Sequence, residues 1–147
     1  MTQPKNYYRR NLPHWHPAGK SFFLTWRLHG SLRYAHLYTL WAYVVMANHV
    51  HVFLKPKGDA TIDRITKQLK GFTAREANLF LGRTGQKFWQ DESFDHWSRD
   101  KDEFSRIVKY IENNPVKAGL VKRPEDWPWS SAAERKRRGW REFKALT

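Results

Sequence analysis

The stretch YTLWAYVVMANHVHVFLK, residues 38–55, decides the fold. Residues 38–46 are rich in aromatic and β-branched side chains, which is typical of a strand. Ala47-Asn48 is a turn signal, and residues 49–55 predict a second strand that Pro56 ends. Because the two segments lie so close in the chain, we expect them to pair as an antiparallel hairpin.

Two further strands are expected, one before and one after this hairpin in the chain. Residues 21–29 (SFFLTWRLH) are rich in aromatic side chains and predict a strand that Gly30-Ser31 ends. Residues 87–98 are aromatic and irregular, and they predict a fourth strand with its flanks.

Two helices are expected from the spacing of the apolar residues. Residues 61–81 and 100–114 both repeat apolar positions at helical spacing. Asp100 and Glu103 resemble a capping box at the start of the second helix, and Pro115 ends it. Strands mixed with two helices predict a small α+β sandwich, with helices packed on a sheet. The expected buried stripes are Ile62, Ile65, Leu69 and Phe72, and Phe104, Ile107, Val108 and Ile111.

The composition is that of a small basic domain. The chain has 147 residues, which suits one domain with one core, and 40% of them are hydrophobic. A net charge of +13, interleaved with 16% aromatic residues, favours a nucleic-acid partner over a charge that serves solubility alone. We interpret residues 1–147 as one domain, with a basic N-terminal arm at residues 1–19 and a basic C-terminal tail at residues 121–147.

The absence of cysteine narrows the possible chemistry. It excludes disulfides, thiolate nucleophiles and cysteine-based zinc sites, and it is consistent with a reducing cytoplasm. Residues 1–10 are polar and basic, without the apolar core of a signal peptide. No apolar run approaches the ~20 residues of a membrane span. We therefore expect a cytoplasmic protein without a membrane partner.

The sequence His49-Val50-His51 is the first candidate site. On a strand, residues i and i+2 point to the same face, so the two imidazoles would lie side by side and can share one divalent metal ion. Val50 would point to the opposite face, into the core. Taken alone, the motif also fits two ordinary strand histidines, one exposed and one hydrogen-bonded.

Tyr110 and Asn114 are the second candidate site. Four residues make about one helical turn, so both side chains would lie on one line that borders the buried stripe. A deprotonated phenol is a nucleophile toward phosphorus, and an amide oxygen suits a hard cation. The alternative is a half-buried tyrosine with its hydroxyl at the surface, and Asn114 as the helix C-cap before Pro115.

Together, the hairpin and the helix contain every part of a phosphodiester-cleaving site. If they meet across the sheet, His49, His51 and Asn114 would hold a metal ion beside the Tyr110 hydroxyl. The metal ion would act as a Lewis acid on the scissile phosphate, and surrounding cations would stabilise the developing charge.

Several short motifs follow one another along nearly the whole chain: LPHWHP (12–17), MANHVHV (46–52), FWQ (88–90), FDHWSRD (94–100), YIENNPVKAGL (110–120) and WPWSS (127–131). In this order they resemble the REP-associated tyrosine transposases, a branch of the single-tyrosine HUH transposases of the IS200-like type. The resemblance implies a ferredoxin-like or RRM-like α+β sandwich, an antiparallel sheet of about four strands with helices packed on it.

The resemblance also implies residue roles and a reaction. His49, His51 and Asn114 would bind Mg²⁺ or Mn²⁺, and Tyr110 would be the nucleophile. The substrate would be single-stranded DNA beside a palindromic hairpin. Cleavage would form a 5′-phosphotyrosine and free a 3′-hydroxyl, and a later 3′-hydroxyl would rejoin the strands without a nucleotide cofactor. The setting would be the bacterial cytoplasm, with a monomer favoured over a homodimer.

Two features depart from the family pattern. Ala47 stands where the family usually has proline, at some loss of turn rigidity. The family also places a helix between the first two strands, whereas only residues 29–37 separate them here and they show no helical stripe. A parallel crossover needs roughly a dozen residues. We therefore expect this helix to be missing, with either a different connection or one sheet face poorly covered.

Basic side chains are the expected contacts to DNA, and exposed Trp or Tyr rings would stack on unpaired bases. Arg9 and Arg10 near the N-terminus, together with the basic run at residues 135–138, are interpreted as flexible arms that contact a hairpin stem. The predicted DNA-binding residues are Arg9, Arg10, Lys67, Lys70, Arg99, Arg106 and Lys109.

Three functions remain open from the sequence. The first is a DNA strand transferase that uses Tyr110. The second is a non-catalytic nucleic-acid binder, either a decayed transposase or a sheet-based RNA-binding module. The third is a metal-dependent hydrolase that uses His49 and His51. Glu112 is a candidate base for such a hydrolase, but it points well away from Tyr110 around the helix.

Overall fold

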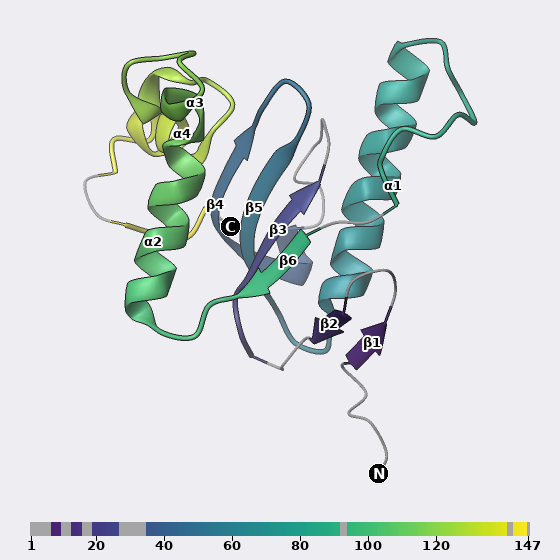
Figure 1. The fold of residues 1–147 in the computed structure, drawn as a ribbon, viewed down its shortest axis with the longest axis horizontal. Helices are drawn as coiled ribbons and strands as arrows, with labels where there is room; N and C mark the ends of the chain where they lie inside the picture. The colour runs from purple at the N-terminus through teal and green to yellow at the C-terminus, as the bar shows by residue number, and fades with distance from the viewer. Residues whose placement is uncertain are drawn as a thin grey trace.

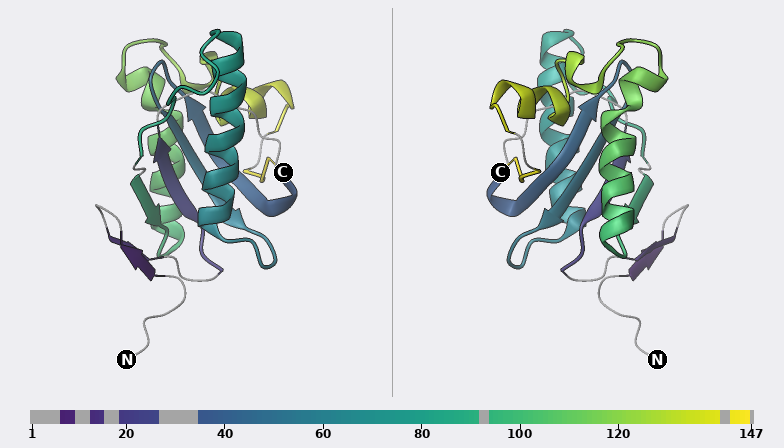
Figure 2. Two further views of the ribbon diagram at one scale, coloured as in Figure 1. Left: turned by 90° about the vertical axis from the view of Figure 1, so that its right-hand side faces the viewer. Right: turned by 90° about the vertical axis from the view of Figure 1, so that its left-hand side faces the viewer.

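The computed structural model contains a central antiparallel sheet with strands in the order β4-β5-β3-β6. The structure describes residues 7–9, 13–15, 19–26, 35–91, 94–140 and 143–146. The strands are β3 (Phe22–Trp26), β4 (Tyr38–Val45), β5 (Val50–Pro56) and β6 (Phe94–Trp97), and the two long helices are α1 (Ile62–Phe80) and α2 (Lys101–Glu112). Helices α1 and α2 lie on opposite faces of the sheet (Figure 1, Figure 2).

Shorter elements surround this three-layer centre. Strands β1 (Tyr7–Arg9) and β2 (Pro13–Trp15) form a separate two-stranded sheet within the expected N-terminal arm. This pairing was not predicted from the sequence. The remaining elements are η1 (Ala35–Leu37), α3 (Asn114–Lys117), η2 (Pro124–Asp126) and α4 (Ser131–Arg137). No helix in the described part of the chain is long and apolar enough to cross a membrane.

The predicted hairpin and α+β fold are confirmed. Strands β4 and β5 pair antiparallel, and a hydrogen bond of 2.9 Å from the Met46 amide to the His49 carbonyl closes the turn between them. Helix α2 starts as predicted, because the Asp100 carboxylate accepts a hydrogen bond of 2.8 Å from the Glu103 amide. Thr61 caps α1 in a similar way, because its hydroxyl accepts a hydrogen bond from the Arg64 amide.

A β-bulge lets strand β4 contribute to both layers of the core. Its register with β5 shifts between Leu40 and Ala42, so Trp41 is the extra residue. Tyr38 and Leu40 are buried on the side of α1, whereas Ala42 and Val44 are buried on the side of α2. One inserted residue inverts the alternation of side chains, and this switch was not predicted from the sequence.

Strand β5 separates the two buried layers by simple alternation. Val50, Val52 and Leu54 pack toward α1, while Phe53 packs toward α2. His51 shares the face of Phe53, because the two residues are two positions apart on the strand. The α2 layer is completed by Ala42, Val44, Met46, Ile107, Val108 and Ile111.

The C-terminal segment covers the outer edge of β4. The Val45 amide donates to the Trp129 carbonyl at 2.9 Å, and the Tyr43 amide donates to the Ser131 hydroxyl at 3.1 Å. Farther along, the Leu146 amide donates to the Leu40 carbonyl at 2.8 Å. An edge strand exposes unpaired backbone groups that invite aggregation, and this segment satisfies several of them.

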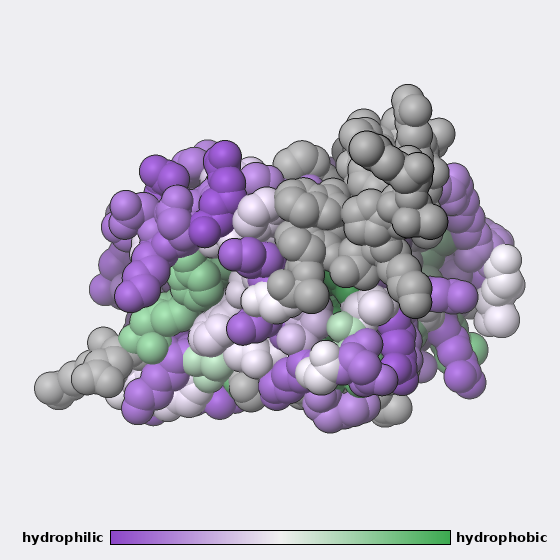
Figure 3. All heavy atoms as spheres, turned by 90° about the horizontal axis from the view of Figure 1, so that it is seen from below, coloured by the Kyte–Doolittle hydropathy of each residue, from purple (hydrophilic) through white to green (hydrophobic). Residues whose placement is uncertain are grey.

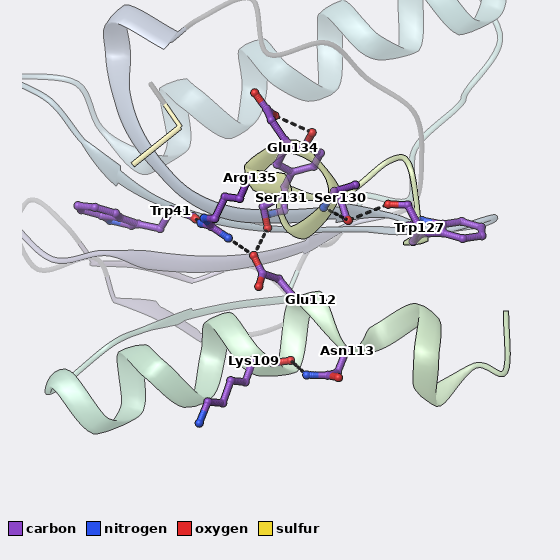
Figure 4. Close-up of polar contacts among 11 residues, drawn as sticks. Trp41, Lys109, Glu112, Asn113, Trp127, Ser130, Ser131, Glu134 and Arg135 are labelled. Atoms are coloured by element: carbon purple, nitrogen blue, oxygen red, sulfur yellow. Dashed lines mark hydrogen bonds and ion pairs between the residues drawn. The ribbon is translucent and has the colours of Figure 1, made fainter. Parts of the chain in front are cut away.

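A buried ion pair fastens helix α4 to helix α2. Arg135 is only 9% exposed and donates to the Glu112 carboxylate and to the Trp41 carbonyl (Figure 4). Ser131 donates a hydrogen bond of 2.6 Å to the same carboxylate. The expectation of a flexible arm at residues 135–138 is therefore wrong, because this part of the chain is folded and Arg135 is needed to neutralise Glu112.

The connection between β3 and β4 is only partly described. Residues 27–34 lie outside the described residues, so the predicted loss of a helix there stays a prediction. Strand β5 lies between β3 and β4 and is antiparallel to both, so β3 and β4 run in the same direction. Packed clusters cover both faces of the sheet, so the expectation of a poorly covered face is not met in the described part.

Replacing Glu112 with Ala should destabilise the fold by about 2–3 kcal/mol, because the guanidinium of Arg135 would lose its charged acceptor while nearly buried. Urea unfolding at neutral pH measures this difference. Glu76→Ala, at an exposed position on α1, is the control and should change stability by less than about 0.5 kcal/mol. Equal effects of the two substitutions would contradict the role assigned to Glu112.

Candidate active site

Strand β5 brings the two predicted histidines together. His49 directly precedes the strand, His51 lies within it opposite Val44, and their ring centroids are 4.8 Å apart. This arrangement follows from the i, i+2 spacing on extended backbone. Two imidazoles at this separation can bind the same cation.

The environment of the two rings suits metal binding. His51 is 5% exposed, and burial, helped by repulsion from His49, lowers its pKa to about 4. The ring is therefore neutral near pH 7, as a metal ligand must be. His49 Nδ1 lies 2.7 Å from the side-chain oxygen of Asn48. If Nδ1 donates this hydrogen bond, Nε2 carries the lone pair with which His49 can bind a metal ion.

Helix α2 places Tyr110 beside His51. The two ring centroids are 5.5 Å apart at an interplanar angle of 66°, and Tyr110 is 43% exposed. Ile107 and Ile111 are buried against the sheet and set the rotation of the helix. Tyr110 consequently lies at the edge of the buried layer, with part of its side chain exposed.

Asn114 is the first residue of α3, four positions after Tyr110 and directly after the C-cap of α2. The C-cap of α2 is Asn113, whose side chain donates to the Lys109 carbonyl at 2.9 Å (Figure 4). The alternative that Asn114 is this cap is therefore wrong. Pro115 lies in the first turn of α3, so the chain stays helical beyond the point where we expected an end. Asn114 itself is half-buried.

The third ligand implied by the resemblance is an amide rather than a carboxylate. Within the described residues, no group of three or more His, Cys, Asp and Glu side chains is arranged to hold a metal ion. The resemblance implies that Asn114 would be the third ligand beside His49 and His51, with oxygen atoms of the substrate or water in the remaining positions. Such ligands are compatible with Mn²⁺ and Mg²⁺.

Lys117 is a residue of this site that was not predicted from the sequence. Its Nζ lies 5.0 Å from the centroid of the Tyr110 ring. Seven residues are about two helical turns, so the spacing from Tyr110 is the signal that identifies it. A cation at this position can interact with the ring and with negative charge near the phenol.

Glu103 links the start of α2 to strand β6. Its carboxylate accepts hydrogen bonds from the Arg99 side chain at 3.1 Å and from His96 Nε2 at 2.9 Å. The bond from Arg99, followed by the one from His96, lowers the pKa of Glu103 to about 2. The return bond of the expected capping box goes to the Arg99 amide instead of the Asp100 amide.

Glu112 faces away from this site. Its carboxylate is engaged by Ser131 and Arg135 on the side of α2 that faces α4. This agrees with the expectation that Glu112 points away from Tyr110, and it leaves Glu112 unsuited to act as a base for His49 and His51.

The predicted DNA-binding residues fall into separate groups. Arg99, Arg106 and Lys109 are exposed on or just before α2, the helix that carries Tyr110. Lys67 and Lys70 belong to α1 in the opposite layer, and Lys70 Nζ donates to the Gln90 carbonyl at 2.8 Å. The structure therefore does not bring these two groups together. Arg10 lies outside the described residues, and for Arg9 only the backbone in β1 is described.

Comparison with known proteins gives concordant matches. The family model described as "Transposase IS200 like" matches residues 30–114, a range that contains His49, His51, Tyr110 and Asn114. The REP-associated tyrosine transposase of Escherichia coli (strain K12) is 31% identical over 91 residues, which cover 61% of this chain and 52% of that protein. The chain spans about half the length of the curated relatives it matches.

A solved structure is similar over nearly the whole chain. It is described as the structure of the REP-associated tyrosine transposase bound to a REP hairpin, and it superposes with a TM-score of 0.66 at 25% identity. The match covers 97% of this chain and 90% of the other.

The contacts of Glu103 predict a pH-dependent contribution to stability. Because its folded pKa of about 2 is below the ordinary 4.5, the ionised form stabilises the fold above pH 4.5. This contribution is lost as the pH falls toward 2. Glu103→Gln should cost about 1–2 kcal/mol at pH 7, a value reduced for solvent screening at exposed Arg99.

Urea unfolding between pH 7 and pH 2.5 measures this effect. The difference between the unsubstituted chain and Glu103→Gln should shrink across the acid range, while the exposed control Glu76→Gln should differ little at any pH. A difference that stays constant down to pH 2.5 would show that Glu103 does not act through its charge.

Proposed function

Because the chain belongs to the IS200-like transposase family, we propose that it cleaves and rejoins single-stranded DNA through a covalent bond to Tyr110. The observation that carries this proposal is the 5.5 Å separation between the rings of Tyr110 and His51. Tyr110 of α2, His51 of β5 and His49 just before β5 lie together at the edge of the buried layer. Metal-assisted phosphodiester transfer uses this combination of a nucleophile and a cation site.

The covalent step is a transesterification at phosphorus. The Tyr110 oxygen attacks the phosphodiester, a phenol O–P bond forms, and the bond from phosphorus to the 3′-oxygen breaks. The proton lost by the phenol is balanced by the proton that the departing 3′-oxygen gains through solvent. Attack by a 3′-hydroxyl on the 5′-phosphotyrosine reverses these changes and rejoins a strand, so no nucleotide cofactor is consumed.

His49, His51 and Asn114 are the residues that would hold Mg²⁺ or Mn²⁺. The buried, neutral ring of His51 and its closeness to His49 support this assignment. A cation bound there would withdraw electron density from the scissile phosphate and favour attack by Tyr110. Imidazole ligands suit Mn²⁺ better than Mg²⁺, so Mn²⁺ is the more sensitive probe.

The proposed partner is single-stranded DNA beside a palindromic hairpin. The net charge of +13 supports a polyanionic partner, and the similar solved structure is described as bound to a REP hairpin. A monomer in the bacterial cytoplasm remains the favoured setting.

A DNA-binding protein without catalytic activity is the second candidate. Ala47 at the turn before His49 and the short segment at residues 29–37 are the departures from the family pattern that favour it. This candidate predicts DNA binding without any covalent product.

Tyr110→Phe should abolish the covalent protein–DNA product and leave DNA binding intact, because only the nucleophilic oxygen is removed. The measurement is a denaturing gel of the protein incubated with labelled single-stranded oligonucleotides and Mn²⁺. Tyr43→Phe is the matched control, since the Tyr43 hydroxyl bonds Glu134 and serves packing of the C-terminal segment.

Each candidate gives a different result in this assay. A strand transferase forms a covalent adduct in the unsubstituted chain and in Tyr43→Phe, and it forms none in Tyr110→Phe. A binding protein forms no adduct in any form. A hydrolase still cuts DNA after Tyr110→Phe, which would sink the proposed nucleophile.

His51→Ala should weaken Mn²⁺ binding at least tenfold, because one of two adjacent imidazole ligands is lost. Calorimetric titration with Mn²⁺ in the absence of DNA measures this affinity independently of activity. His36→Ala, at an exposed position in η1, is the control and should bind Mn²⁺ normally. Unchanged Mn²⁺ affinity in a folded His51→Ala protein would contradict the metal site.

A further inference from the structure

Asn48 lies in the turn between β4 and β5, and its side chain contacts the ring of His49. The two atoms in contact are Asn48 Oδ1 and His49 Nδ1, which are 2.7 Å apart. This distance is at the short end of the range for hydrogen bonds between nitrogen and oxygen. Asn48 is exposed and His49 is half-buried, so the contact lies at the border between the surface and the buried layer.

The turn lies at one end of the molecule, at the top of the ribbon in Figure 1. Figure 3 views the opposite end, where apolar surface lies among hydrophilic side chains. A substitution at Asn48 therefore changes the surface around the candidate site and leaves the opposite end as it is.

The backbone on both sides of Asn48 is held by other interactions. The Met46 amide donates to the His49 carbonyl at 2.9 Å. The side chains of Met46 and Val50 are buried in the two layers of the core, on the side of α2 and on the side of α1. The Val45 amide donates to the Trp129 carbonyl, which fastens the end of β4 to the C-terminal segment. These interactions hold the turn independently of the Asn48 side chain, so its contact with His49 acts mainly on the ring.

The amide oxygen of Asn48 determines which nitrogen of the His49 ring carries the proton. An amide oxygen only accepts hydrogen bonds, so a neutral imidazole that bonds to it through Nδ1 must hold its proton there. Nε2 then carries the lone pair and is the nitrogen that can bind a cation. The other neutral form has its proton on Nε2 and cannot bind a metal ion through that atom without losing it.

The neighbouring side chains show why this choice matters. The ring of His49 lies 4.8 Å from that of His51, which lies beside Tyr110. Two imidazoles can share a cation only if each presents an unprotonated nitrogen to it. In metal sites, the other nitrogen of a ligand histidine usually donates to a carboxylate or a carbonyl oxygen. The amide of Asn48 takes this place and is neutral, so it adds no negative charge beside an anionic phosphate.

We propose that Asn48 is a positioning residue, which accepts a hydrogen bond from Nδ1 of His49 and thereby keeps Nε2 available to bind Mn²⁺ or Mg²⁺. This deepens the proposed function and rests on it, because it concerns the same pair of histidines. An exposed hydrogen bond competes with water, so it changes the ratio of the two ring forms by at most about tenfold. When the form that binds the cation becomes the minor one, the apparent affinity falls by a similar factor.

Nitrogen NMR of the isotopically labelled, metal-free full chain tests the form of the ring without any reaction. At about pH 8.5, where ordinary histidine rings are neutral, His49 should show a protonated Nδ1 and an unprotonated Nε2. The loss of signals in His49→Gln identifies this ring. In Asn48→Ala the form with the proton on Nε2 should gain population, because the acceptor at Nδ1 is removed. In Asn48→Asp the proton should stay on Nδ1, because a carboxylate oxygen accepts the same hydrogen bond.

Calorimetric titration with Mn²⁺ in the absence of DNA gives the second readout. Asn48→Ala should weaken Mn²⁺ binding by roughly three- to tenfold. Asn48→Asp should bind Mn²⁺ at least as tightly as the unsubstituted chain, because its carboxylate orients the ring and also attracts the cation. Ala47→Ser, at the exposed position next to Asn48 in the same turn, is the control and should bind Mn²⁺ normally.

The outcomes separate this proposal from the proposed function. A proton on Nε2 of His49 in the unsubstituted chain, or unchanged Mn²⁺ affinity in Asn48→Ala, would overturn the positioning role whether or not Tyr110 forms an adduct. Equal losses of affinity in Asn48→Ala and Ala47→Ser would assign the effect to the shape of the turn and would also overturn it. The expected ring forms and affinities, with no adduct from the unsubstituted chain, would keep the role of Asn48 and contradict the covalent chemistry.

Discussion

The packing of α2 against β4 and β5 is the constraint on which the candidate site depends. Ile107, Val108 and Ile111 bury their side chains in this layer, and each buried aliphatic side chain contributes about 1.5–3 kcal/mol. Burial of this kind fixes the rotation of the helix more firmly than surface ion pairs do. Tyr110 precedes Ile111 directly, so the same packing sets it beside His51.

The C-terminal segment and the bulge in β4 support this layer from the other side. Trp41 is the extra residue of the bulge, and its ring packs on Phe104 of α2. Its carbonyl accepts a hydrogen bond from Arg135, which also binds Glu112 of α2. The sheet edge, α4 and α2 therefore form one connected structure.

The sequence predicted the parts of the site that depend on local geometry. The pairing of His49 with His51 follows from strand alternation, and Tyr110 follows from the apolar stripe of α2. Lys117 was missed, although its spacing from Tyr110 is also local, because Pro115 was expected to end the helix. The bulge and the cover over β4 depend on contacts between distant segments, which no local pattern encodes.

Mass spectrometry of the covalent protein–DNA product tests the central claim most directly. After nuclease and protease digestion, the account predicts that the residual nucleotide is attached to the peptide that contains Tyr110 and that the linkage is a phosphotyrosine. Attachment to another tyrosine, such as Tyr43 or Tyr38, or to a serine would contradict the account. It would show that the DNA strand is not cut at the site formed by Tyr110, His49 and His51.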